Sequence, residues 1–123
     1  MMENCGVFRD NDKLTKALED IRSFQVRFKK ARVMDKSKRF NTDVLAALET
    51  SHLLTFSEVI VEGAQARTES RGAHYRTDYT KRDDENWIKH TLAHKTKGGQ
   101  PPALSYKSVN IDWDKYPPQE RKY

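Results

Sequence analysis

The sequence predicts a mainly α fold: a helical hairpin or three-helix bundle, followed by a small C-terminal β-hairpin and an extended tail. Apolar residues recur at spacings of three and four through two long segments of the first 70 residues. The rest is irregular and charged, and it closes on alternating apolar residues. We therefore expect a single domain over 1–123, with a helical part at about 1–70 and an irregular motif and β-hairpin at about 71–123.

The first helix is expected to start at Asn11-Asp12, with Asp12 as the capping residue. Positive charge in its last turn, from Arg27, Lys29 and Lys30, suits the helix dipole. The polar stretch 32–40 is expected to be a connecting loop. The apolar face of this helix consists of Leu14, Ala17, Leu18, Ile21, Phe24 and Phe28.

The second helix is expected to begin at Asn41-Thr42-Asp43 and to run to about Thr68, about 40 Å at ~1.5 Å per residue. Two such helices leave much of their apolar surface in water, so a third partner is needed, such as a short helix near the N-terminus or after Arg82. No apolar run approaches the ~20 residues of a membrane span. The apolar stripe consists of Val44, Leu45, Leu48, Leu53, Phe56, Val59 and Ile60.

The last third is expected to hold turns and strands. Gly72 is a helix-stop candidate, since glycine adopts the left-handed conformation easily. Gly98-Gly99 with Pro101-Pro102 marks a turn, and the alternation in 103–112 indicates a strand that pairs with the segment after Trp87. Pro117-Pro118 begins an extended tail that ends at Arg121 and Tyr123.

Composition argues against a self-contained enzyme. Hydrophobic residues make up 36% of the chain and charged residues 33%, which allows only a modest core. The lone Cys5 excludes an internal disulfide and suits a reducing compartment, and no signal peptide is visible. His90 and His94 could share a zinc ion on a helix, but in a strand they stand about 13 Å apart. No glycine-rich nucleotide loop is present. We therefore assign no catalytic, cofactor or metal residue.

The net charge of +5 is unevenly distributed. The segment from Arg22 to Arg39 carries +7, which leaves −2 for the rest of the chain. Such a patch suits nucleic acid or another anionic partner, and a basic binding module is one alternative function. We do not expect nucleic-acid binding, because no aromatic reading motif accompanies the charges, and a solvated helix end is the simpler interpretation.

A dense set of charged and planar side chains follows the second helix. Arginine forms forked hydrogen bonds with carboxylates, so this composition predicts an ion-pair network that fixes the path of the chain. We prefer that structural role to a catalytic one. The candidate structural or docking residues are Glu69, Ser70, Arg71, Gly72, His74, Arg76, Asp78, Arg82, Asp83, Asp84, Trp87 and His90.

The same residues carry a family resemblance. Glu69-Ser70-Arg71-Gly72-Ala73-His74, Arg76-x-Asp78-Tyr79, Arg82-Asp83-Asp84-Glu85-Asn86-Trp87 and Lys89-His90-Thr91-Leu92 occur in this order. With Gly6-Val7-Phe8-Arg9 and Pro117-Pro118-x-x-Arg121-x-Tyr123, they resemble the C-terminal domain of the succinate dehydrogenase and fumarate reductase flavoprotein subunit. The family usually has proline where Thr80 stands. L-aspartate oxidase, which carries a relative of the first motif, is the alternative, but the stretch from Trp87 and the Pro-Pro tail favour the dehydrogenase branch.

The resemblance implies a fragment of a larger flavoprotein, with Met1 to Asn4 ending a preceding helix. In the family, FAD and the catalytic residues belong to the upstream FAD-binding and capping domains. The parent subunit would oxidise succinate to fumarate and pass electrons to an iron–sulfur subunit and quinone. We expect the fragment alone to be inactive and without flavin, and to dock on the FAD-binding domain through Arg71 to Asp78. The implied location is cytoplasmic, peripheral to the inner face of the cell membrane, with membrane contact only through the complex.

Overall fold

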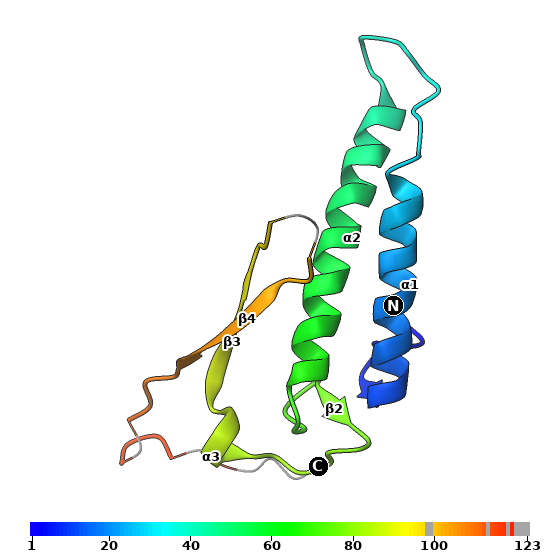
Figure 1. The fold of residues 1–123 in the computed structure, drawn as a ribbon. Coiled ribbons are helices and arrows are strands. Elements are labelled where there is room, and N and C mark those ends of the chain that lie inside the picture. Colours follow the sequence, from blue (N-terminus) through cyan, green and yellow to red (C-terminus); the bar gives the residue numbers. More distant parts are fainter. Residues whose placement is uncertain (98–99, 113, 118, 120–123) are drawn as a thin grey trace.

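The structure, a computed structural model, describes residues 1–97, 100–112, 114–117 and 119. It is mainly α-helical with two small sheets, as expected (Figure 1). Gly98-Gly99 of the predicted turn, and Pro118, Arg121 and Tyr123 of the predicted tail, lie outside the described residues. The elements are β1 (Phe8–Arg9), α1 (Asn11–Phe28), α2 (Thr42–Ala66), β2 (Tyr75–Arg76), α3 (Asp84–Trp87), β3 (Lys89–His94) and β4 (Ala103–Ser108).

The capping residue of helix α1 lies two residues earlier than predicted. The capping residue is Asp10, not Asp12, because the backbone of Asp10 is extended and its Oδ1 accepts a hydrogen bond from the backbone N–H of Lys13 at 2.8 Å. Asp12 lies inside the first turn, where its negative charge still suits the helix dipole.

Helix α2 starts as predicted, with Asn41 Oδ1 accepting from the backbone N–H of Val44 at 2.9 Å, and ends at Ala66. It lies antiparallel against α1 as the hairpin that the sequence predicts (Figure 1). Phe24, expected on the packing face of α1, is 48% exposed. The core between the helices and the N-terminal segment consists of Cys5, Leu14, Ala17, Leu18, Ile21, Val61 and Ala64.

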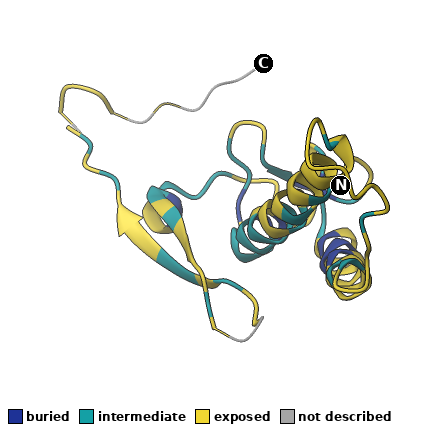
Figure 2. Ribbon diagram, turned by 90° about the horizontal axis from the view of Figure 1, so that it is seen from above, coloured by how far each residue is buried: buried dark blue, intermediate teal, exposed yellow. Residues whose placement is uncertain are grey.

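The predicted apolar stripe of α2 faces mostly outward. Ala47, Leu54 and Val61 follow one another at intervals of seven residues, and this side of α2 is the more buried one, with Val61 fully buried. The other side lacks cover, and Figure 2 shows exposed ribbon over much of both helices. The outward face consists of Val44, Leu45, Leu48, Leu53, Phe56 and Ile60, with exposed fractions of 42% to 66%.

Helix α2 is also long and apolar enough to cross a membrane by length and composition, with a mean hydropathy of 1.4 over its most apolar window. The expectation from the sequence, that no apolar run approaches the ~20 residues of a membrane span, applied a different criterion. It considered only unbroken apolar runs, whereas in α2 the apolar residues are interspersed with Thr, Ser and Gly. Only 6% of this window is buried within the chain, which marks the helix as one that lacks a partner here.

The two small sheets attach the remaining segments to the hairpin. β1 pairs in parallel with β2, and β3 pairs in antiparallel with β4, which confirms the predicted β-hairpin. The short helix expected after Arg82 is α3, a single turn capped by Asp83, whose Oδ1 accepts from the backbone N–H of Asn86 at 2.9 Å. The two long helices pack chiefly on each other. The described part of the chain is thus a hairpin of two long helices and one helical turn.

Gly72 does not stop a helix, because α2 ends six residues before it. Gly72 has a φ of 58° and takes the first central position of a tight turn in which Arg71 and His74 exchange backbone hydrogen bonds of 2.8 and 3.1 Å. A positive φ at that position, as in type II′ turns, requires glycine. The glycine is therefore needed for the turn that follows the helix and not for the end of the helix.

Candidate functional site

The candidate residues converge where α2 ends, and Glu69 is at their centre. Its side chain is fully buried. Oε1 accepts from Arg67 Nη1 at 2.5 Å and Arg71 Nε at 2.8 Å, while Oε2 accepts from Arg71 Nη2 and the backbone N–H of Asp83, both at 2.9 Å. Burial raises the pKa of this carboxyl, but the donors from Arg71, Asp83 and Arg67 outweigh it and leave the pKa below its usual value. Glu69 is therefore ionised and fully engaged.

The ion pairs continue outward from Glu69 to α3. Arg71 Nη2 donates to Asp84 Oδ1 at 2.8 Å, and Asp84 Oδ2 also accepts from Arg82. Arg82 in turn donates to the backbone oxygen of Gln119 at 2.6 Å, which brings the tail back to the network. We call the connected set Arg67, Glu69, Arg71, Arg82 and Asp84 the Glu69 network.

A second ion pair, between the buried Arg76 and the exposed Asp78, joins the two long helices. Arg76 is 1% exposed and holds both carboxylate oxygens of Asp78, at 2.7 Å each. The same guanidinium donates through Nη1 to the backbone oxygens of Ala64 and Gln65, at 3.0 Å each, at the C-terminal end of α2. Asp78 Oδ2 accepts from the backbone N–H of Asn11 at the start of α1. The pair thus binds the negative end of one helix dipole and the positive end of the other.

The pKa of the Asp78 carboxyl is lowered to about 2. The main cause is the side-chain hydrogen bond from Arg76, and the backbone N–H of Asn11 adds to it. Ser70 supports the same turn, since its Oγ accepts from the backbone N–H of Arg76 at 2.8 Å and donates to the backbone oxygen of Tyr79 at 2.7 Å.

His74 anchors the N-terminal strand to this motif. Its Nδ1 lies 2.6 Å from Arg9 Nη1 and its Nε2 lies 3.3 Å from the backbone oxygen of Arg67. Because arginine only donates, Nδ1 accepts and the proton resides on Nε2. Burial, together with the charges of Arg9, Arg76 and Arg67, lowers the pKa of His74. The ring is therefore a neutral connector between β1 and the end of α2.

Trp87 links the network to the β-hairpin. It is buried, donates from Nε1 to Thr68 Oγ1 at 3.1 Å, and lies between the cations of Arg67 and Lys89, 4.8 and 4.4 Å from the ring centre. Tyr106 of β4 contacts the same ring edge-on at 5.6 Å. The hairpin is thus held at its Trp87 end.

Eleven of the twelve candidates belong to this region, and His90 does not. His90 is exposed on β3, beyond the network. Sequence reasoning missed Arg67 and Arg9, which contribute essential donors. Arg67 stands two residues before Glu69 and was identifiable from that spacing, whereas Arg9 lies 65 positions from His74 and no local signal marks it.

The region has little capacity for chemistry. In the part of the chain that the structure describes, every buried side-chain nitrogen and oxygen has a hydrogen-bond partner. The same residues contain no group of three or more His, Cys, Asp or Glu side chains placed to hold a metal ion. Groups that already bind one another cannot also bind a substrate, so the arrangement rigidifies the end of the helical hairpin.

The fold and these contacts define a helical hairpin domain whose described buried polar side chains all have hydrogen-bond partners within the chain. The family described as "Fumarate reductase flavoprotein C-term" matches residues 1–123, so the chain belongs to this family of flavoprotein C-terminal domains. The chain is 44% identical to the fumarate reductase flavoprotein subunit of Haemophilus influenzae over 123 residues, all of this chain and 20% of that protein. It is 39% identical to the succinate dehydrogenase flavoprotein subunit of Coxiella burnetii, covering 98% of this chain and 20% of that protein.

Solved structures agree. An Escherichia coli quinol fumarate reductase chain matches with a TM-score of 0.84 and 42% identity over 89% of this chain and 19% of its own length. A quinol–fumarate reductase solved with menaquinol molecules gives a TM-score of 0.81 and 40% identity, over 87% of this chain and 19% of its own. The chain thus spans about one fifth of the length of the relatives it matches.

Proposed function

We propose that this chain is the C-terminal docking domain of a flavoprotein subunit that interconverts succinate and fumarate through FAD. The family and the one-fifth coverage support the assignment to a larger subunit. The observation that carries the docking role is the uncovered apolar face of α2, six large residues that are 42% to 66% exposed. Monomeric soluble proteins rarely leave such a contiguous apolar surface in water.

The docking surface we propose is the outward face of α2, not the segment Arg71 to Asp78 that the sequence favours. The network residues satisfy one another, so they have little left to offer a partner. Their role is to fix the angle between the hairpin, β1 and α3, which presents α2 as a rigid surface to the flavin-bearing part of the subunit. That part is where FAD would supply the hydride-accepting chemistry.

The residues of this chain do not fit a flavin site. The sequence has no glycine-rich loop at a strand-to-helix turn, and the described buried polar groups are already paired. The proposed electron path to an iron–sulfur subunit and quinone therefore belongs to the rest of the assembly. The proposed peripheral location at the inner face of the membrane is that of the whole complex.

We propose that a third helix, from outside this chain, completes the bundle. The backbone N–H of Cys5 donates to the oxygen of Met1 at 2.7 Å, which is a helical turn, and Cys5 is buried in the core between α1 and α2. A helix that ends in this turn would bring further apolar side chains to the hairpin.

The test is made in the whole subunit. Replacing Leu53 and Phe56 on the outward face by Asp places two charges where we propose a dry contact, so flavin retention and succinate-dependent dye reduction should fall sharply. Lys16→Glu, an exposed charge change on α1, is the control and should retain both. If the double variant keeps its flavin and activity, α2 does not dock there. If the unaltered subunit fails to oxidise succinate or reduce fumarate, the proposed reaction is wrong.

A further inference from the structure

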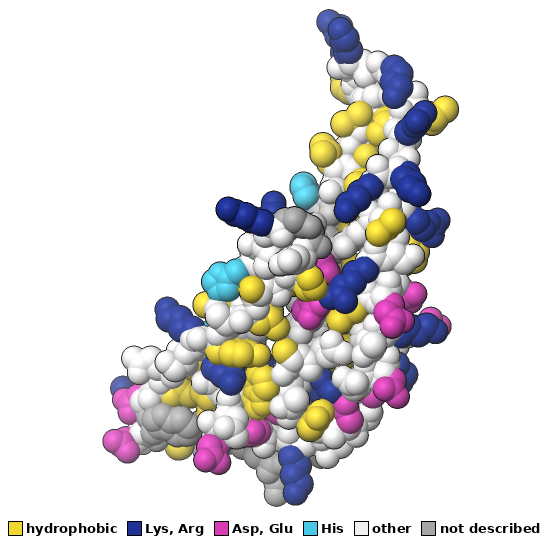
Figure 3. Space-filling view, viewed as in Figure 1, with side chains coloured by type: hydrophobic (Ala, Val, Ile, Leu, Met, Phe, Trp, Pro, Cys, Tyr) yellow, Lys and Arg dark blue, Asp and Glu magenta, His cyan; other side chains and the backbone are white. Residues whose placement is uncertain are grey.

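The tip of the helical hairpin concentrates the net positive charge of the molecule. Seven cations and one acid, Asp35, occupy residues 27–40, which gives the tip +6 and leaves −1 for the rest of the chain. Figure 3 shows Lys and Arg side chains gathered at this end. The cations are Arg27, Lys29, Lys30, Arg32, Lys36, Lys38 and Arg39.

Within the described residues these cations make only local contacts, since Lys36 Nζ donates to the backbone oxygen of Val33 and Arg27 lies over the Phe24 ring. The ion pairs between described residues lie elsewhere, in the Glu69 network, at Arg76, at Arg22 and at Lys13, and no described carboxylate pairs with any of the seven tip cations. Asp35 caps its own loop, accepting from the backbone N–H of Ser37 at 2.7 Å. Seven cations held together without compensation repel one another, so the tip is suited to an anionic partner.

Apolar groups project from the same loop. Phe40 is 99% exposed and Met34 is 83% exposed. Phe40 also has a φ of 52°, the left-handed conformation that a bulky residue adopts at a cost of roughly 1 kcal/mol or more. A fully exposed aromatic side chain on a strained backbone contributes nothing to the stability of its own domain. Phenylalanine, methionine and arginine are enriched at protein interfaces, where such rings act as anchors.

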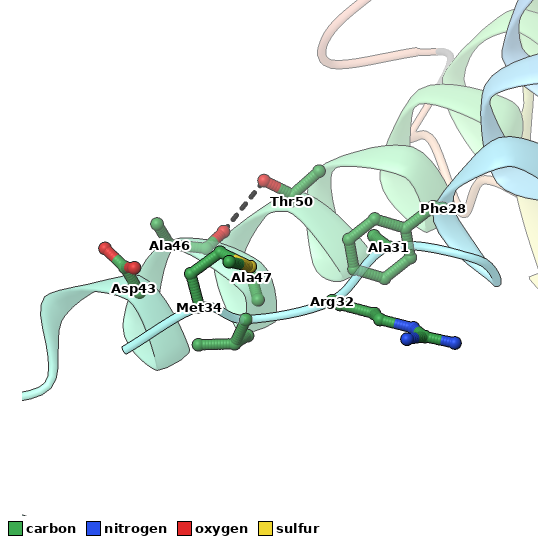
Figure 4. Close-up of a pocket in the computed structure, with 9 residues that line it drawn as sticks. Phe28, Ala31, Arg32, Met34, Asp43, Ala46, Ala47 and Thr50 are labelled. Atoms are coloured by element: carbon green, nitrogen blue, oxygen red, sulfur yellow. Dashed lines mark hydrogen bonds between the residues drawn. The ribbon is translucent and has the colours of Figure 1, made fainter. Parts of the chain in front are cut away.

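A cavity of about 390 Å³ lies directly beneath this loop (Figure 4). It opens between the end of α1, the loop and the first turns of α2, and its apolar lining is formed by Phe28, Ala31, Val33, Met34, Ala46 and Ala47. The charged residues on its wall are Arg32 and Asp43. An apolar recess with Arg32 and Asp43 on its wall has the anatomy of an interface centre that receives one large side chain.

The chemistry of the tip indicates what kind of partner it binds. Its net charge of +6 suits an acidic surface. A shaped recess suits a side chain of a protein better than lipid headgroups, and a single protruding aromatic provides little stacking surface for bases.

We propose that the tip, residues 27–40, binds another subunit of the same complex through an acidic surface that carries a large apolar side chain for the cavity. This inference rests on the proposed function, since it needs the domain to be part of a multi-subunit enzyme. The acidic surface pairs with the tip cations, Phe40 and Met34 pack against the partner, and its apolar side chain enters the recess beneath Met34.

The experiment measures the affinity of the purified whole subunit for the remaining subunits, at low (about 0.05 M) and high (about 0.3 M) salt. In the charge variant, Arg32, Lys36, Lys38 and Arg39 are replaced by Glu. This variant should bind about tenfold or more weakly at low salt and lose the salt dependence of the unaltered subunit. Ala46→Trp, which fills the cavity, and Phe40→Gly should weaken binding at both salt concentrations. Lys16→Glu, about 16 Å along α1 from the start of the tip, is the matched control and should bind normally.

Phe40→Gly separates recognition from folding. Glycine relieves the left-handed strain, so the variant should unfold no more readily than the unaltered subunit while it binds the partner more weakly. All tip variants should keep the flavin and the succinate-dependent dye reduction of the free subunit, so loss of partner binding leaves the proposed function standing.

Three outcomes would overturn the inference. The first is unchanged partner affinity in every tip variant. The second is a lower flavin content or thermal stability of the free charge variant, which would mean that the tip is covered by its own subunit. The third is a charge variant that binds the other subunits normally but no longer binds vesicles of anionic phospholipid or an RNA oligonucleotide.

Discussion

At the residue scale, the structure depends on a few arginines that are more buried than their charge would suggest. Arg76 has almost no exposed surface, and its guanidinium donates hydrogen bonds to Asp78 and to the last carbonyls of α2. Its guanidinium therefore acts both as an ion-pair partner and as a cap for the helix. Glu69 is the matching case for a carboxylate.

Removing Arg76 should destabilise the chain severely. Arg76→Ala removes a buried side chain and leaves the carbonyls at the end of α2 without their donor, so we expect a loss of about 2 kcal/mol or more in the free energy of unfolding. Arg22→Ala, which breaks pairs of a 43% exposed side chain with Glu58 and Glu62, should cost less than about 1 kcal/mol. Urea denaturation measures both, and equal losses would refute the special role of Arg76.

Asp78 should make the stability depend on acid pH. Its pKa is about 2 in the folded chain and 3.8 without its partners, so its contribution is fully present above pH 3.8 and is lost as the pH falls toward 2. The difference in free energy of unfolding between the unaltered chain and Asp78→Asn should therefore narrow over that range. Asp12→Asn serves as the control for a carboxylate in the first turn of α1. If the difference in free energy of unfolding between the unaltered chain and Asp78→Asn stays constant down to pH 2, the Arg76–Asp78 pair is contradicted.

The sequence predicted which residues between Glu69 and Trp87 cluster, but it did not predict every contact that connects this cluster to the rest of the chain. The run from Glu69 to Trp87 has a composition that predicts an ion-pair network, and the network is there. Arg9 was not predictable, because it reaches His74 only after β1 pairs with β2, a contact across more than 60 residues. Such pairings depend on tertiary packing, which local composition does not report.

At the element scale, helix α2 is the informative part. Its apolar residues cover most of its circumference, so periodicity predicted the helix but not the side that packs. The more buried side of α2 includes Ala47, Leu54 and Val61, while Leu53 and Phe56 face outward. A sequence pattern cannot distinguish a helix face that packs within its own domain from one that packs on another domain or subunit.

The start of α1 offers a direct test of its observed cap. Asp10→Ala removes the acceptor for the backbone N–H of Lys13 and should lower the free energy of unfolding by about 1 kcal/mol. Asp12→Ala removes only a charge near the helix start and should cost less, about 0.5 kcal/mol. Thermal or urea unfolding of the two variants compares them, and a larger loss for Asp12→Ala would restore Asp12 as the cap.

At the scale of the whole molecule, the chain has three distinct regions: an end held by the Glu69 network, an exposed apolar face along α2 and a cationic tip (Figure 3). The network gives the domain a fixed shape. The described residues of the chain leave the apolar face and the tip uncovered. The helical hairpin and the β-hairpin were predictable from periodicity. The exposed apolar surface of the helical hairpin was also predictable, because two helices alone leave apolar surface in water.

The most direct test of the account is the accessibility of the outward face of α2 to a thiol reagent. A cysteine introduced as Phe56→Cys should react rapidly with a maleimide in this chain alone and much more slowly in the whole subunit, where the flavin-bearing part covers it. Lys16→Cys is the control and should react equally in both, while the buried Cys5 stays protected. Equal reactivity of Phe56→Cys in the two contexts, read by mass spectrometry, would contradict the docking role of α2.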